Sequence, residues 1–117
     1  MILDIRVLSG VTPSALVAAV AAHVPGEVGV DQYGNPSLRT DAGTIVAAES
    51  LWDTGLVYAE VRSSDAALAN RVYDVLVDNT DWEVSLVDSS DNHPEDVVLR
   101  HRAQPPNLLG AEKIPNG

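Results

Sequence analysis

The strictest pattern in this chain is the alternation of apolar and polar side chains in residues 1–8 and 56–62. In the first segment apolar residues occupy every second position, with Asp4 and Arg6 between them. Successive side chains of a β-strand point to opposite faces, so each segment predicts a strand with one apolar and one solvated face. Two such strands predict a sheet that is covered on one side only, as antiparallel sheets often are.

Two helices are predicted, each directly after one of these strands. Thr12 is a good N-cap with Pro13 at the first helical position, and Pro25 stops the apolar stripe that follows. Ser64 is the expected N-cap of the second helix, and Asn79 is its expected C-cap. The strands and helices therefore alternate in a way that brings both helices to one face of a sheet.

The order of elements predicts the fold class. Further strands are expected at residues 28–31, 38–40, 44–48, 82–87 and 97–101. This order is typical of an α+β protein with a ferredoxin-like split β-α-β pattern, in which two helices lie on one face of an antiparallel sheet. We expect a single domain over residues 1–102 and a flexible, extended, proline-containing tail over residues 103–117.

Charged residues are expected on the uncovered face of this sheet. Asp4 and Arg6 on the first strand should face Glu60 and Arg62 on a neighbouring strand. Opposite charges at facing positions stabilise a sheet by roughly 0.2–1 kcal/mol per pair, which predicts a structural role for these residues.

The charge and the cysteine content exclude several classes of partner. The formal net charge is −10, with 17 acids against seven bases. Phosphate backbones repel such a surface, so no nucleic-acid partner is expected, whereas a basic protein surface is suitable. The chain contains no cysteine, which excludes disulfides and thiolate zinc sites and suits the cytoplasm. Its apolar runs are far shorter than the roughly 20 residues of a membrane helix, so no membrane partner is expected.

The negative charge is concentrated in one segment. Eight acids lie in the 23 residues from Asp74 to Asp96, without a Lys or Arg among them. Asp74 and Asp78 lie late in the second helix, where they repel each other and face the negative end of the helix dipole. A cationic partner that offsets this unfavourable electrostatic free energy is one explanation for the acidic segment. The other is a helix end and loop that are simply solvated. The predicted partner-binding residues are Asp74, Asp78, Asp81, Trp82, Glu83, Asp88, Asp91, Glu95 and Asp96.

Metal binding by the same segment is weakly indicated. Asp88, Ser90 and Asn92 have the spacing of the first three ligands of an EF-hand loop. Position six of that loop is His93 instead of Gly, and position twelve is Leu99 instead of Glu. We therefore predict no metal site and no cofactor.

No residue pattern indicates catalysis. The chain has three histidines, His23, His93 and His101, but no serine lies in a Gly-x-Ser-x-Gly context. No acid lies inside an apolar run, where burial would raise its pKa for acid–base work. No catalytic residue is predicted, and the protein is not expected to be an enzyme.

The function predicted from these observations is docking onto a basic protein. In size, acidity and lack of cysteine the chain is similar to the immunity proteins of bacterial toxin systems, which implies inhibition of a basic toxin or nuclease. One alternative is a structural or assembly subunit of a phage or homo-oligomer that uses a sheet edge and the C-terminal tail. Another is a small-molecule-binding domain or an enzyme without a recognisable motif.

Overall fold

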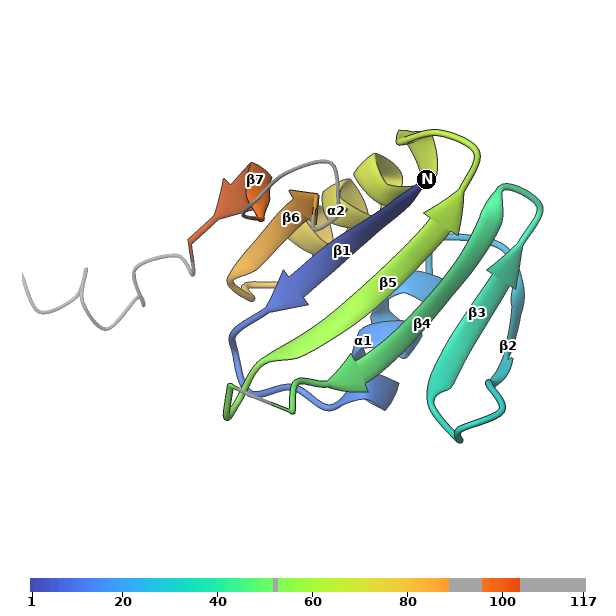
Figure 1. Ribbon diagram of the computed structural model, residues 1–117, viewed down its shortest axis with the longest axis horizontal. Coiled ribbons are helices and arrows are strands. Elements are labelled where there is room, and N and C mark those ends of the chain that lie inside the picture. Colours follow the sequence, from blue (N-terminus) through green and yellow to red (C-terminus); the bar gives the residue numbers. More distant parts are fainter. Residues whose placement is uncertain (52, 89–95, 104–117) are drawn as a thin grey trace, which may run out of the picture.

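The described part of the chain forms a sheet of seven strands with two helices (Figure 1). The computed structural model describes residues 1–51, 53–88 and 96–103. The strands are β1 (Ile2–Val7), β2 (Glu27–Val30), β3 (Pro36–Thr40), β4 (Gly43–Glu49), β5 (Val57–Ser63), β6 (Val84–Asp88) and β7 (Val97–Arg102). The helices are α1 (Pro13–Ala21) and α2 (Ala67–Asn79).

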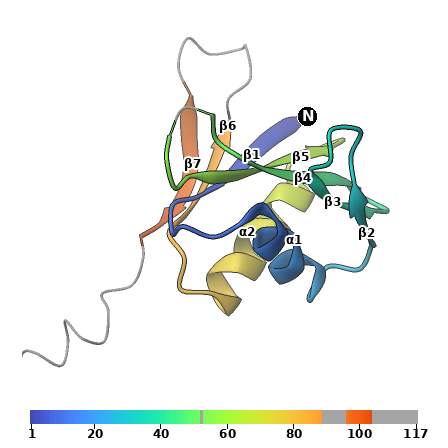
Figure 2. The same ribbon diagram turned by 90° about the horizontal axis from the view of Figure 1, so that it is seen from below.

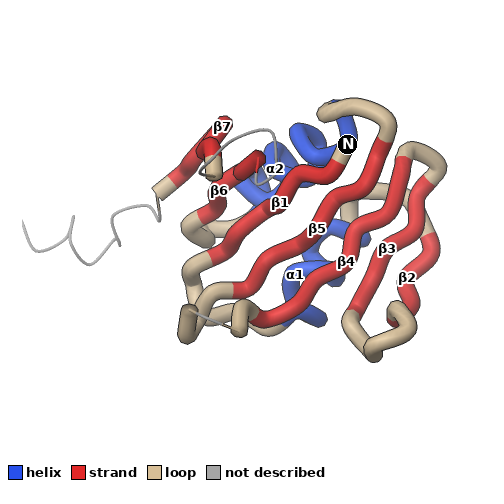
Figure 3. Tube along the Cα trace, viewed as in Figure 1, coloured by secondary structure: helices blue, strands red, loops and turns tan. Residues whose placement is uncertain are grey.

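All neighbouring strands of the sheet are antiparallel, in the order β2-β3-β4-β5-β1-β6-β7. Strand β1 lies near the centre, between β5 and β6 (Figure 3). Both helices lie on the same face of the sheet, and no helix of the described residues lies on the other face (Figure 2). The predicted α+β class with an antiparallel sheet and two helices is confirmed, but the sheet is larger than the four strands of a split β-α-β unit.

The core lies between the sheet and the helices. Alternation along the strands turns one row of aliphatic side chains toward the helices, and residues such as Ile5 and Ile45 are completely buried. Helix α1 packs against β3, β4 and β5, whereas α2 packs against β1, β5 and β6. No polar or charged side chain among the described residues is buried in this core. Every charge of the described chain therefore lies on a surface.

The predicted N-cap is confirmed for α1 and is wrong for α2. Thr12 caps α1 as predicted, because its Oγ1 accepts a hydrogen bond of 3.1 Å from the amide of Ala15. The prediction of Ser64 as the cap of α2 is wrong, since residues 64–66 form bends before the helix begins. The carboxylate of Asp65 instead accepts a hydrogen bond from the amide of Ala67. No helix in the described residues is long and apolar enough to cross a membrane.

The register of β1 against β5 corrects one prediction about the uncovered face. The two strands are neighbours, and their charged side chains share that face as predicted. However, Asp4 lies directly opposite Glu60, so two acids face each other instead of opposite charges. Arg62 pairs with Glu60 on its own strand at 2.6 Å, and Arg6 pairs with Asp96 at 2.7 Å. The ion pair of Arg6 with Asp96 thereby links β1 to the residue that precedes β7.

Candidate functional site

The acidic segment does not form one surface, because its residues lie on both faces of the sheet. The contacts of β7 with the acidic segment show this division, because the side chains of β7 alternate between the two faces of the sheet. Arg100 and Arg102 point toward the helix layer, where they contact α2. His101 lies on the opposite face and contacts Glu83, with 3.0 Å between its Nε2 and the carboxylate. The bases that follow the acidic segment in sequence therefore meet acids on both faces.

Asp74 is paired within the chain. Its carboxylate accepts a hydrogen bond of 2.8 Å from Arg100. The guanidinium of Arg100 also lies over the ring of Tyr73, 4.2 Å from the centroid, and donates to the side chain of Asn70. Both partners of the ion pair are well exposed, so its contribution to stability is small.

The negative end of α2 is capped by Arg102. Its Nη2 donates to the carbonyls of Thr80 at 2.7 Å and Trp82 at 2.8 Å, and its Nη1 donates to the carbonyl of Val77 at 3.1 Å. A positive charge at this end of a helix offsets the repulsion between the dipole and nearby acids. The cation that Asp74 and the helix end require is thus supplied by β7 of the same chain.

The remaining predicted residues differ in their surroundings. Trp82 is half-buried and packs against the core. Asp78 and Asp81 are exposed, and neither forms an ion pair within the described part of the chain. Asp88 ends β6 and is half-buried.

Two of the predicted residues, Asp91 and Glu95, lie outside the described residues. The same holds for most of the weak calcium site considered for residues 88–96. Asp96, which begins the last described segment, is exposed and lies on the uncovered face of the sheet, where it pairs with Arg6.

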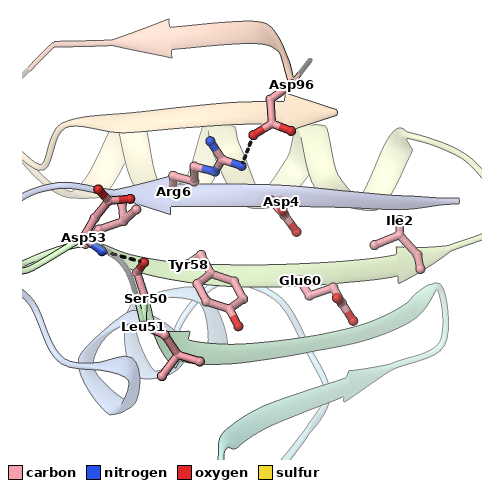
Figure 4. A pocket seen from close by; sticks show the side chains of 10 residues that line it. Ile2, Asp4, Arg6, Ser50, Leu51, Asp53, Tyr58, Glu60 and Asp96 are labelled. Carbon is pink, nitrogen blue, oxygen red and sulfur yellow. Dashed lines mark hydrogen bonds and ion pairs between the residues drawn. The ribbon is translucent and has the colours of Figure 1, made fainter. Parts of the chain in front are cut away.

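That uncovered face contains a hollow that the sequence did not predict. The hollow has a volume of about 440 Å³ and lies over β1 and β5, beside the connection from β4 to β5 (Figure 4). It is lined by Ile2, Asp4, Arg6, Ser50, Leu51, Asp53, Leu56, Tyr58, Glu60 and Asp96. We call this hollow the sheet groove.

The sheet groove has an excess of negative charge. Among the described residues that line it, four are acids and one is a base, which gives these residues a formal charge of −3. Asp4 and Glu60 lie opposite each other on the floor, and Asp53 and Asp96 lie on two sides of it (Figure 4). The base, Arg6, is paired with Asp96. The groove is therefore suited to a cationic group and repels an anionic one.

The connection from β4 to β5 forms one wall of the groove. The Oγ of Ser50 accepts a hydrogen bond of 3.1 Å from the amide of Asp53, which fixes the backbone at this turn. The side chain of Leu51 is 90% exposed and Tyr58 is half-buried on the floor. The groove thus combines carboxylates with apolar and aromatic surface, a mixture found at binding sites.

Two further hollows continue the groove across the sheet. One, of about 510 Å³, extends it toward β6 and β7 and shares Arg6, Asp53 and Leu56 with it. The other, of about 390 Å³, extends it toward the β2–β3 turn and shares Glu60 with it. Together they extend from Val98 on β7 to Tyr33 in the turn. A surface of this length and openness is suited to a macromolecule.

The chemistry of the described residues does not indicate a metal centre. No group of three or more His, Asp or Glu residues in the described ranges is arranged to hold a metal ion. The pKa of Asp31 in the β2–β3 turn is lowered from its ordinary value. Hydrogen bonds from the backbone amides of Asn35 and Tyr33 lower it, whereas desolvation opposes them. These bonds order the turn.

The sequence contained part of the signal for the groove. The strand pattern predicts Asp4, Arg6 and Glu60 on one solvated face, with a structural role. The wall formed by Ser50, Leu51, Asp53 and Leu56, and the position of Asp96, depend on tertiary structure, which the strand pattern does not encode. No protein-family model, curated protein or solved structure matches this chain.

Proposed function

We propose that this protein is a binding protein that docks onto a basic surface of another protein through the sheet groove. The observation that carries the proposal is the open, helix-free sheet face with a formal groove charge of −3. Complementary charge steers association and fixes orientation, while apolar groups such as Leu51 and Tyr58 supply contact area.

The groove is a better docking site than the end of α2. Asp74 is occupied by Arg100, and the carbonyls at the helix end are occupied by Arg102. On the sheet groove, by contrast, acids still outnumber bases when the ion pairs of Arg6 with Asp96 and of Arg62 with Glu60 are both counted. We therefore place the partner-binding surface on the face opposite the helices.

A finer assignment of fold and role belongs to the same proposal. The central strands β4, β5, β1 and β6, with α1 and α2 following β1 and β5, support an elaborated ferredoxin-like split β-α-β unit. The acidic groove supports an inhibitor or immunity-type role against a basic toxin or nuclease. The lack of cysteine supports a cytoplasmic location.

Neutralising acids at the two competing sites tests the proposal. The groove variant carries Asp53→Asn and Glu60→Gln, and the control variant carries Asp78→Asn and Asp81→Asn, with the same change of charge. An oligoarginine peptide serves as the basic probe, with binding followed by calorimetry and by amide shifts in NMR spectra. We expect the groove variant to bind about tenfold more weakly, which corresponds to about 1.4 kcal/mol, and the control variant to bind as the parent does.

The outcomes separate the two surfaces. Shifts that cluster on β1 and β5, together with weaker binding at higher salt, support docking at the groove. If the control variant loses binding and the groove variant does not, the helix end is the docking surface and the proposal fails. Equal losses in both variants show that only net charge matters, which also contradicts it. Thermal unfolding of both variants confirms that the fold is retained.

A structural or assembly role is the second candidate function. It is favoured by the outer strand β2, whose four residues are all exposed. Analytical ultracentrifugation of the whole chain and of a chain without residues 104–117 tests this candidate. A loss of oligomer on truncation supports assembly, whereas a monomer in both cases contradicts it.

A further inference from the structure

The two edges of the sheet differ in how they are protected from further strand pairing. At the β7 edge the register shifts between Leu86 and Val87, and β7 carries charged residues such as Arg100. Shifts of this kind and charged side chains are the usual devices that protect an edge. At the other edge β2 follows β3 in register from Glu27 to Val30 without a shift, and its single charged residue, Glu27, lies at its first position. Strand β2 is therefore the less protected edge.

The backbone of β2 presents hydrogen-bonding groups to the outside. The amide of Asp31 donates to the carbonyl of Asn35 at 2.9 Å, which sets the alternation of the antiparallel ladder. In that alternation Gly29 bonds to β3, whereas the amide and carbonyl groups of Val28 and Val30 point away from β3. Outward amide and carbonyl groups at every second residue are the groups that a further antiparallel strand would bond to.

The side chains of β2 provide apolar surface at the same edge. Val28 is 61% exposed and Val30 is 69% exposed. Val28 lies opposite Leu38, which is completely buried under the helix layer, so both valines continue the apolar side of the sheet. Helix α1 packs on β3, β4 and β5, and β2 lies beyond it at the edge of the sheet (Figure 2).

Charge selects the kind of strand that fits. Glu27 is the first residue of β2 and Asp31 follows its last residue; each is two positions from Gly29, and strand alternation places both positions on the uncovered side of the sheet. Suppose that the β2 strands of two copies pair antiparallel, with Gly29 of one copy opposite Gly29 of the other. Asp31 of each copy then lies opposite Glu27 of the other copy. Like charges at facing positions are destabilising, whereas Lys or Arg at those positions is favourable.

We propose that β2 accepts an extended segment of another protein as an eighth, antiparallel strand of the sheet. The segment carries apolar residues opposite Val28 and Val30 and basic residues opposite Glu27 and Asp31. This surface is separate from the sheet groove and does not depend on docking there. Main-chain hydrogen bonds supply affinity in this mode of recognition, and the alternating side chains supply specificity.

A peptide of matching pattern tests the inference. Its central residues are Lys-Val-Ser-Val-Lys, and a control peptide carries Glu in place of both Lys. Amide hydrogen exchange, measured by NMR on the full chain, reports on the edge directly. We expect the Lys peptide at saturation to slow exchange at Val28 and Val30 about tenfold or more, with little change at Gly29, whose amide already bonds to β3.

Two variants separate strand pairing from other binding. Val30→Pro removes an outward amide without removing a bond to β3, since proline is tolerated at such edge positions. Val28→Thr keeps the backbone and weakens only the apolar contact. We expect Val30→Pro to abolish protection at Val28 and Val28→Thr to weaken binding severalfold. Unchanged exchange at Gly29 confirms that β2 still pairs with β3.

The results that overturn the inference are distinct. Absence of protection by the Lys peptide, equal protection by the Glu peptide, or undiminished binding to both variants excludes the proposed strand. A dimer in analytical ultracentrifugation that Val30→Pro dissociates assigns the edge to a second copy instead. The Asp53→Asn and Glu60→Gln variant should bind the Lys peptide at β2 like the parent, which distinguishes a failure here from a failure at the groove.

Discussion

Removal of the Arg102 side chain should unfold the end of α2 and destabilise the whole protein. The guanidinium donates to three carbonyls, those of Val77, Thr80 and Trp82. A hydrogen bond with one charged partner contributes about 1.5–3 kcal/mol net. Arg102 is only half-buried, so water replaces part of each lost bond. We therefore expect Arg102→Ala to lower the free energy of unfolding by about 2–4 kcal/mol in total.

Denaturation by guanidinium chloride measures this loss, with Arg100→Ala as the matched control. Arg100 forms an exposed ion pair with Asp74 and lies over Tyr73, so its removal should cost only about 1 kcal/mol. Arg102→Lys keeps the charge but offers one nitrogen to three carbonyls. Its loss of unfolding free energy should therefore lie between the losses of the two alanine variants. Amide exchange should accelerate at the last turn of α2 in Arg102→Ala alone. A loss below about 1 kcal/mol, or equal losses for both alanine variants, would refute the capping role.

Two further predictions concern local structure. Thr12→Ala should lower the free energy of unfolding by about 1 kcal/mol in denaturant titrations, whereas Ser64→Ala should have almost no effect because Ser64 caps no helix; similar losses would contradict this. The carboxyl of Asp31 should titrate below its ordinary pKa of 3.8 in NMR spectra, because the backbone amides of Asn35 and Tyr33 bond to its charged form. Since the folded pKa is the lower one, the contribution of the turn to stability is present above about pH 4 and is lost as the pH falls through the lowered pKa. A midpoint at or above 3.8 would contradict the hydrogen bonds.

The sequence was a good guide to the local elements of this fold. The alternation in residues 1–8 and 56–62 predicted two strands with one solvated face, and β1 and β5 have that face. Thr12 followed by Pro13 predicted the start of α1 to the residue. These signals succeeded because each depends on contacts within a few residues.

The candidate site was harder to predict because its contacts connect distant parts of the chain. The acidic segment contains no Lys or Arg, so an external cation is a reasonable hypothesis for Asp74 from the sequence. The cations come from Arg100 and Arg102, 26 and 22 residues away from their partners Asp74 and Thr80. The path of β7 along α2 brings them there, and side-chain alternation in β7 alone does not reveal which helix it meets.

The central position of β1 has a consequence for how the chain folds. Strand β1 precedes both of its neighbours in the sheet, β5 and β6, which follow it by about half and about two thirds of the 117 residues. Such distant pairings make folding slow, because the entropy of closing a long loop is lost before the contacts form. During synthesis β1 has neither neighbour until most of the chain has left the ribosome. Its apolar row is therefore exposed for that time, which makes this strand the natural point of contact for a chaperone.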